Sequence, residues 1–150
     1  MSNDEGPGPG VTRRLAYLLK HAQLRMAELN ERALAPFGVN GRELGVLNVL
    51  MGREPGSQHE AAQRLGIDRT TMVALLDTLE RKGLVSRHPH AEDRRRNVVE
   101  LTEVGHETVV KANAAAEVAE AEMMAPLSRA DGQQLRESLQ AIVAGVRTRE

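Results

Sequence analysis

Two predicted helices separated by a short break, Gly66-Ile67-Asp68, constrain the fold of this 150-residue chain more than any other feature. Ser57 followed three residues later by Glu60 is typical of a helix start, and Gly66 is typical of a helix end. Asp68 is a favourable N-cap for the second helix, which is expected from about residue 69 to residue 82. A short helix, a tight turn containing glycine and a second helix predict a helix-turn-helix.

The segment after the second helix predicts a β-hairpin. Gly83 ends the helix, and the β-prone segments 84–87 and 97–101 flank the polar loop 88–96. That loop contains Arg94-Arg95-Arg96, whose planar guanidinium groups bond well to phosphates and base edges. A basic hairpin directly after a helix-turn-helix predicts a winged helix, whose wing follows a DNA backbone or enters a minor groove. For the arginine run alone, the alternative is a solvated charged turn.

The remaining segments predict long helices. Apolar residues at a period of 3.6 indicate a helix from about residue 15 to Pro36-Phe37-Gly38, and Asn40 with Glu43 indicates the start of another. Thr102 begins a long helix that Pro126 ends, and Ser128 with Asp131 begins the last. We therefore expect a mainly α fold with a small β-hairpin, a winged helix-turn-helix core plus long dimerisation helices. The expected domains are a flexible tail at 1–10, a helical dimerisation region at 11–37 and 103–150, and a winged helix-turn-helix DNA-binding domain at 38–102.

Composition narrows the class of protein. The chain has no cysteine, which excludes disulfides, cysteine nucleophiles and thiolate metal sites. The net charge is −1, yet residues 69–97 hold seven basic and four acidic side chains, so positive charge gathers around the helix-turn-helix and hairpin. No apolar run has the roughly 18 residues that a membrane span requires. A cytoplasmic location without membrane association is expected.

The second helix of the pair has one apolar face and one face of short side chains. Met72, Leu75, Leu76 and Leu79 cluster on one side, while Thr70, Val73, Ala74, Asp77 and Arg81 occupy the other. Short side chains allow a helix to enter a major groove, where hydroxyls and methyls contact base edges. The alternative is an ordinary core helix with a solvent face. The expected DNA-contacting residues are Arg69, Thr70, Thr71, Val73, Asp77, Arg81, Arg94, Arg95 and Arg96.

Residues 65–105 resemble the winged-helix core of the MarR family of bacterial transcription regulators. The matching pieces are Asp68-Arg69-Thr70-Thr71, Leu79-Glu80-Arg81-Lys82-Gly83-Leu84-Val85, Asp93-Arg94-Arg95 and Leu101-Thr102-Glu103-x-Gly105. The resemblance extends over about residues 11–148. It implies an obligate homodimer, joined by its first and last helices, on an inverted-repeat operator of double-stranded DNA. It also implies that Arg94 inserts into a groove and that Arg95 braces Asp93.

One departure from the family pattern affects base recognition. Members often have Thr and then Arg on the recognition helix where this chain has Val73 and Ala74. An arginine there can make a bidentate contact to guanine, and Ala74 cannot. We expect base recognition to depend on Arg69, Thr70, Thr71 and Val73, with a larger contribution from DNA shape.

A homodimer also follows from the apolar pattern of the last helix. Leu135, Leu139, Ile142 and Val146 form a seam at near-heptad spacing that a single winged helix cannot cover. A second copy of the chain is the economical way to bury this seam. The alternative is a monomer that buries both terminal helices internally.

An effector site is expected between the dimer helices and the winged helix, because the resemblance implies a cleft there for phenolic or carboxylate compounds. On the first helix, Arg14, Tyr17, Leu18 and His21 have the spacing of one face, with Leu44 and Leu47 as an apolar wall. Arg14 would pair with a carboxylate of a small aromatic effector. The alternative is that Tyr17 packs at the dimer interface while Arg14 and His21 are solvated.

No catalytic motif is present, so we expect no enzyme activity and no cofactor. His88-x-His90 supplies only two ligands beside repelling arginines, so no metal site is expected. The favoured function is a ligand-responsive repressor. The alternatives are a winged-helix protein-interaction module or antirepressor, and a non-specific architectural DNA binder.

Overall fold

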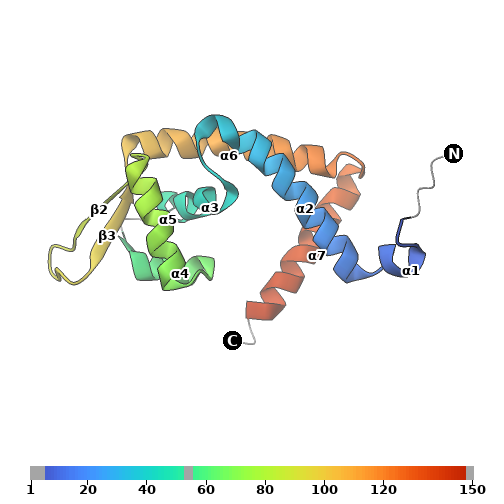
Figure 1. Cartoon of the computed structure of the whole chain (residues 1–150), viewed down its shortest axis with the longest axis horizontal. Coiled ribbons are helices and arrows are strands. Elements are labelled where there is room, and N and C mark those ends of the chain that lie inside the picture. The colour runs from blue at the N-terminus through green and yellow to red at the C-terminus, as the bar shows by residue number, and fades with distance from the viewer. Residues whose placement is uncertain (1–5, 53–55, 148–150) are drawn as a thin grey trace.

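The computed structural model describes residues 6–52 and 56–147 of the chain. The molecule is elongated, with a small mixed lobe at one end and long helices extending from it to the other (Figure 1). The elements in chain order are α1 (Pro9–Thr12), α2 (Leu15–Leu34), the 3-10 helix η1 (Ala35–Phe37), α3 (Gly41–Met51), β1 (Gly56–Ser57), α4 (Gln58–Leu65), α5 (Arg69–Arg81), β2 (Val85–Pro89), β3 (Asn97–Leu101), α6 (Glu103–Met124) and α7 (Arg129–Arg147). The predicted fold class, a mainly α winged helix with long additional helices, is confirmed.

The helix starts lie where the capping residues predicted them. Asn40 and Glu43 form a reciprocal capping box at α3, with Glu43 N donating to Asn40 Oδ1 at 2.8 Å. Asp68 caps α5 and Thr102 caps α6, each by accepting from the backbone N–H three residues ahead. Ser128 Oγ accepts from Asp131 N at 3.1 Å before α7. These caps satisfy backbone groups that a helix start would otherwise leave unpaired.

Three short elements differ from the sequence expectation. Pro36 lies inside the 3-10 helix η1, so the chain continues for one more turn before Gly38 turns it at φ 68°. Pro9 and Gly10, expected in a flexible tail, belong to the single turn α1, while residues 1–5 of that tail lie outside the described residues. The two-residue strand β1 pairs with β3, giving the antiparallel order β1-β3-β2. Two residues are too short to produce a β period, and their pairing partner is distant in sequence.

The core of the lobe is aliphatic and lies between α3, α4, α5, the sheet and the first half of α6. Its largest fully buried side chains include Leu34, Leu47, Met72, Leu76 and Leu79. Val99 of β3 and Val109 of α6 close it from the other side. This core contains residues of both α5 and the root of the β2–β3 hairpin, so it packs the one against the other.

Gly105 allows α6 to start against the hairpin. A Cβ atom at this position would lie 2.0 Å from the carbonyl oxygen of Leu84. Thr102 N donates to the same oxygen at 3.0 Å, and the Thr102 hydroxyl donates to Gly83 O at 2.6 Å. The close approach ties the root of the hairpin to α6 and requires a residue without a side chain.

The helices outside the lobe leave much apolar surface uncovered. The helix α2 packs along α6, whereas α7 extends away from the end of α6 (Figure 1). The ion pair between Arg136 NH2 and Glu120 Oε2, at 2.9 Å, joins α7 to α6. The exposed apolar side chains of α1, α2 and α7 are Val11, Leu15, Leu18, Leu19, Leu24, Leu135, Leu139, Ile142, Val143 and Val146. Within the described ranges, no helix combines the length and the apolar character needed to cross a bilayer.

Candidate nucleic-acid interface

The helix α5 presents the two faces that its sequence predicts. Met72, Leu76 and Leu79 are buried in the core. Thr70, Ala74, Asp77 and Arg81 are exposed on the opposite side, with Thr71 and Val73 half-buried between the two faces. The exposed surface of α5 therefore consists of short side chains along its middle, as entry into a major groove requires.

The first turn of α5 is fixed by Asp68 and Thr71. The backbone N–H of Thr71 donates to Asp68 Oδ1 at 2.8 Å, and the Thr71 hydroxyl donates to Oδ2 at 2.6 Å. These two hydrogen bonds, the one from the hydroxyl above all, lower the pKa of Asp68. Because the Thr71 proton is engaged with Asp68, Thr71 acts in this structure as part of the cap. The neighbouring Thr70 is exposed.

A hollow of about 300 Å³ lies between α4, the start of α5 and the hairpin. Arg69 and Val73 line it from α5, and Arg95 and Arg96 line it from the loop between β2 and β3. The rest of its lining is His59, Glu60, Ala62, Met72 and Asn97. Four of the predicted DNA-contacting residues, from two separate segments, thus line one basic hollow. Cations here would be attracted to the phosphates of a nucleic-acid backbone.

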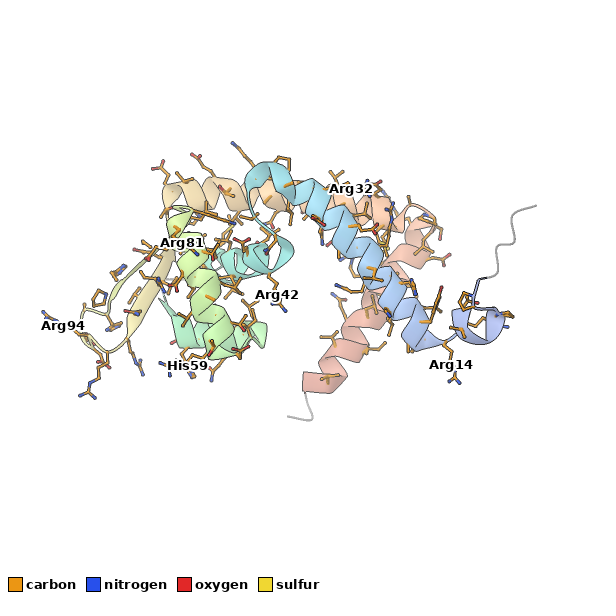
Figure 2. The ribbon with its side chains drawn as sticks, in the orientation of Figure 1. Arg14, Arg32, Arg42, His59, Arg81 and Arg94 are labelled. Carbon is orange, nitrogen blue, oxygen red and sulfur yellow. The ribbon has the colours of Figure 1, made fainter. Side chains whose placement is uncertain are left out.

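The hairpin loop is a tight turn organised by Asp93. Arg96 N donates to Asp93 O at 3.0 Å, and Arg95 N donates to Asp93 Oδ1 at 3.1 Å. The side chain that pairs with Asp93 is that of Arg96, with Nε 3.9 Å from Oδ2. Arg95, expected to brace Asp93, contacts the carboxylate in this structure through its backbone N–H, while Arg96 supplies the side-chain ion pair. Arg94 lies at the hairpin tip and its side chain extends away from the lobe (Figure 2).

Arg81 lies at the opposite end of α5 from the basic hollow. Twelve residues separate it from Arg69, which is about 18 Å along a helix at 1.5 Å per residue. Its guanidinium group bonds locally, from Nε to Asp77 O at 3.4 Å and from NH2 to Thr78 Oγ1 at 3.3 Å. Figure 2 shows it well separated from Arg94. Any contact of Arg81 with DNA would be to a different part of the duplex.

Arg87 of β2, which was not among the residues expected at the site, pairs with two carboxylates of α5. Its NH2 group lies 3.0 Å from Glu80 Oε1, its Nε donates to Glu80 Oε2 at 3.5 Å, and NH2 also pairs with Asp77 Oδ1. The hydrogen bond between Arg87 and Glu80 raises the pKa of Arg87 and lowers that of Glu80. Asp77, expected to contact DNA, is thus engaged by Arg87. The alternation of side chains along a strand could have indicated this contact. Arg87 follows the buried Val85 by two residues and therefore lies on the same face of β2, toward the protein.

The expected effector residues do not all come together. Arg14 is the exposed N-cap residue of α2, Leu18 is exposed, and the rings of Tyr17 and His21 lie 4.1 Å apart. The wall residues expected with them are elsewhere, because Leu44 and Leu47 are enclosed in the core of the lobe, 6% and 0% exposed. On an amphipathic helix a leucine can face either the core or a cleft, and here both face the core. They present no surface to a ligand.

The hairpin histidines have local partners. His88 Nδ1 lies 3.7 Å from Glu100 Oε1 across the two strands, and His90 Nδ1 accepts from Glu92 N at 3.1 Å. Over the part of the chain that the structure describes, no three His, Asp or Glu side chains gather closely enough to hold a metal ion.

Comparison with known proteins gives a consistent result. A model of the MarR family matches residues 37–96. The transcriptional repressor CouR bound to a 23-mer DNA duplex is 31% identical, over 93% of this chain and 96% of CouR, with a TM-score of 0.81. CouR from Rhodococcus jostii RHA1 bound to p-coumaroyl-CoA is 27% identical, over 90% of this chain and 95% of that one, with a TM-score of 0.76. A MarR-family regulator from Rhodococcus sp. RHA1 is also 27% identical, over 87% and 95%, with a TM-score of 0.76.

Proposed function

Because the chain belongs to the MarR family of DNA-binding transcription regulators, we propose that it is a repressor that binds an inverted-repeat operator as a homodimer. We further propose that a small effector releases it from DNA. The observation that carries the proposal is the basic hollow, where Arg69 of α5 and Arg95 of the hairpin face one space. In this arrangement α5 is the recognition helix and the β2–β3 hairpin is the wing. A duplex docked there would meet both at once.

Sequence recognition would come from the exposed face of the recognition helix. Thr70 offers a hydroxyl to base edges, and Val73 and Ala74 offer methyl groups to thymine. None of these three residues makes a bidentate contact to guanine. Arg69 at the helix start and Arg94 at the wing tip would add phosphate and minor-groove contacts, so DNA shape contributes a large share of the specificity.

The homodimer is supported by the uncovered apolar side chains of α1, α2 and α7. Leu15, Leu19, Leu139, Ile142 and Val146 are exposed in the single chain. Exposed apolar surface of this extent marks an interaction site, and a twofold partner would cover the same helices on both copies. Two winged helices related by such an axis would contact half-sites about one helical turn, roughly 34 Å, apart.

The effector we propose is an aromatic acid, bound either as the free carboxylate or as its coenzyme A thioester. CouR from Rhodococcus jostii RHA1, which is 27% identical to this chain, has a structure with p-coumaroyl-CoA bound. In this chain Arg14 would pair with the carboxylate of the free acid or with a phosphate of the coenzyme A group. Tyr17 and His21 would hydrogen-bond to a substituent of the aromatic ring. Leu44 and Leu47 are no longer part of the proposed site. The test is calorimetry with a panel of aromatic acids and thioesters, in which binding unaffected by Arg14→Ala would refute this site.

The DNA-binding proposal is tested by recovering genomic fragments bound by the protein. Their affinity is then measured by fluorescence anisotropy against an excess of random duplex. A repressor should bind one inverted-repeat sequence at least a hundredfold more tightly than random DNA and should reduce transcription from it. Equal affinity for all sequences would indicate an architectural DNA binder. The absence of any salt-dependent DNA binding would indicate a protein-interaction module or antirepressor.

A further inference from the structure

The wing is joined to the recognition helix by two kinds of contact. At its root, the chain passes directly from α5 through Lys82, Gly83 and Leu84 into β2. Further along β2, Arg87 reaches back to Glu80 and Asp77 on α5. Since β2 and β3 are hydrogen-bonded from Val85–Leu101 to Pro89–Asn97, any rotation about the root would carry the two strands together. Arg87 therefore supplies side-chain contacts that can oppose such a movement.

We propose that Arg87 is a positioning residue that clamps the wing to the recognition helix at the angle needed to engage DNA. Asp77 and Glu80 are three residues apart on one face of α5, so a single guanidinium group spans almost a full helical turn. Contacts at two separated points fix both the position and the rotation of the wing, whereas one contact would leave a pivot. The planar fork of arginine is suited to this, and lysine would hold one carboxylate. The predicted effect of the clamp on DNA affinity rests on the proposed function. The contacts of Arg87 with Asp77 and Glu80 do not depend on it.

The burial of Arg87 distinguishes it from the wing arginines that are candidates for DNA contact. Its side chain is 18% exposed, while that of Arg96 is 69% exposed. The bidentate contact with Glu80 uses Nε and NH2 together. A guanidinium group held in this way is directed at the protein rather than toward an incoming duplex.

The negative charges of Asp77 and Glu80 make the proposal testable. Electrostatic repulsion and the clamp predict opposite changes in DNA affinity when these two carboxylates are removed. Asp77 and Glu80 are negative groups on the side of α5 that carries the wing. If their only effect on DNA were repulsion, removing them would strengthen binding. If they hold the wing through Arg87, removing them weakens binding even though two negative charges are lost.

The first experiment measures the DNA affinity of the double variant Asp77→Ala/Glu80→Ala by anisotropy. Alanine is the best helix former, so α5 should keep its structure, which circular dichroism checks. Arg87 itself stays in place, so a loss of affinity cannot come from a missing arginine contact. We expect about tenfold weaker binding. The matched control is Glu92→Ala, which removes an exposed negative charge from the wing and should leave binding unchanged or tighter.

The second experiment measures the position of the wing without DNA. Since the chain has no cysteine, spin labels can be attached to Ala74→Cys on α5 and Ala91→Cys on the wing. The distance distribution between the labels should broaden when Asp77→Ala/Glu80→Ala is added. Tighter or unchanged DNA binding, or an unbroadened distribution, would overturn the clamp. Weaker binding with an unbroadened distribution would assign the carboxylates a direct DNA contact instead. If the wild type bound no DNA, the proposed function would fail while the distance measurement still decided the clamp.

Discussion

Lys82, at the end of the recognition helix, is paired with the buried carboxylate of Glu43 at the start of α3. Its Nζ lies 2.6 Å from Glu43 Oε2 and 2.7 Å from Gly38 O. The other oxygen of Glu43 accepts from Asn40 N at 3.2 Å, so one carboxylate completes a helix cap and anchors a second helix. Glu43 is 4% exposed and is the buried charged residue of the described core. The ion pair fixes the end of α5 from which the wing emerges.

Replacing Lys82 by Met should destabilise the fold by about 2 kcal/mol, because it leaves a nearly buried carboxylate without its cation. Glu43→Gln should cost less, since the amide keeps an acceptor for Asn40 N and no charge remains buried. The measurement is urea denaturation of both variants. The control is Arg25→Ala, which breaks an exposed ion pair with Glu28 and should change stability by under about 0.5 kcal/mol. A Lys82→Met variant as stable as this control would contradict the prediction.

The features that the sequence predicted well are those whose partners are close in the chain. The caps at Asn40 and Asp68 join residues three apart, so composition and spacing were sufficient. The ion pair of Lys82 with Glu43 joins residues 39 apart, and no local pattern indicates it. The pairing of β1 with β3 was missed for the same reason.

In the candidate site, too, the features that follow from local sequence were predicted and those that depend on tertiary geometry were not. The outward face of α5 follows from helical periodicity, and the basic loop follows from its arginine run. Which arginine side chain pairs with Asp93 depends on the turn geometry, because Arg96 forms the ion pair while Arg95 contacts the carboxylate through its backbone N–H. Leu47 was assigned to a ligand cleft because periodicity identifies an apolar face but not what covers it.

Gly105→Ala should destabilise the protein by about 3 kcal/mol. The added Cβ would lie 2.0 Å from Leu84 O, so the first turn of α6 must move away from the root of the wing. Gly41→Ala, where the added atom meets nothing within 4 Å, is the matched control and should be neutral or slightly stabilising. Thermal denaturation of the two variants gives the comparison. Equal melting temperatures would show that α6 can shift at little cost.

The stabilisation provided by Asp68 should depend on pH. Its pKa is lower in the folded protein than in the unfolded chain, because the Thr71 hydroxyl and N–H donate to the ionised form. Its contribution is therefore present above the unfolded pKa, about 3.9, and is lost as the pH falls through the folded pKa. The difference in free energy of unfolding between wild type and Asp68→Ala should narrow between pH 5 and pH 2. Thr71→Val, which removes the hydroxyl donor, should reduce this pH dependence. A difference in free energy of unfolding between wild type and Asp68→Ala that stays constant from pH 5 to pH 2 would contradict the prediction.

Arg94→Ala should weaken operator binding roughly tenfold and reduce the slope of log K against log salt by about one for each wing. The side chain extends from the wing tip, where it can reach a groove without moving the lobe (Figure 2). Arg32→Ala, on α2 and well separated from Arg94 in Figure 2, is the control and should leave the slope unaltered. The measurement is the operator affinity of both variants by fluorescence anisotropy over a range of salt concentrations. A slope that Arg94→Ala does not alter would remove Arg94 from the interface.

Ile142→Asp should dissociate the proposed homodimer. Ile142 lies among the uncovered apolar side chains of α7, and a carboxylate in each copy would have to be buried at the twofold contact. Val104→Asp is the matched control, because Val104 is equally exposed, at 57%, but lies in the first turn of α6 beside the wing root. Light scattering after size exclusion should give a monomer for Ile142→Asp and a dimer for Val104→Asp. Because a single winged helix reaches one half-site, the monomer should also lose most of its operator affinity. A dimer that survives Ile142→Asp would place the interface elsewhere.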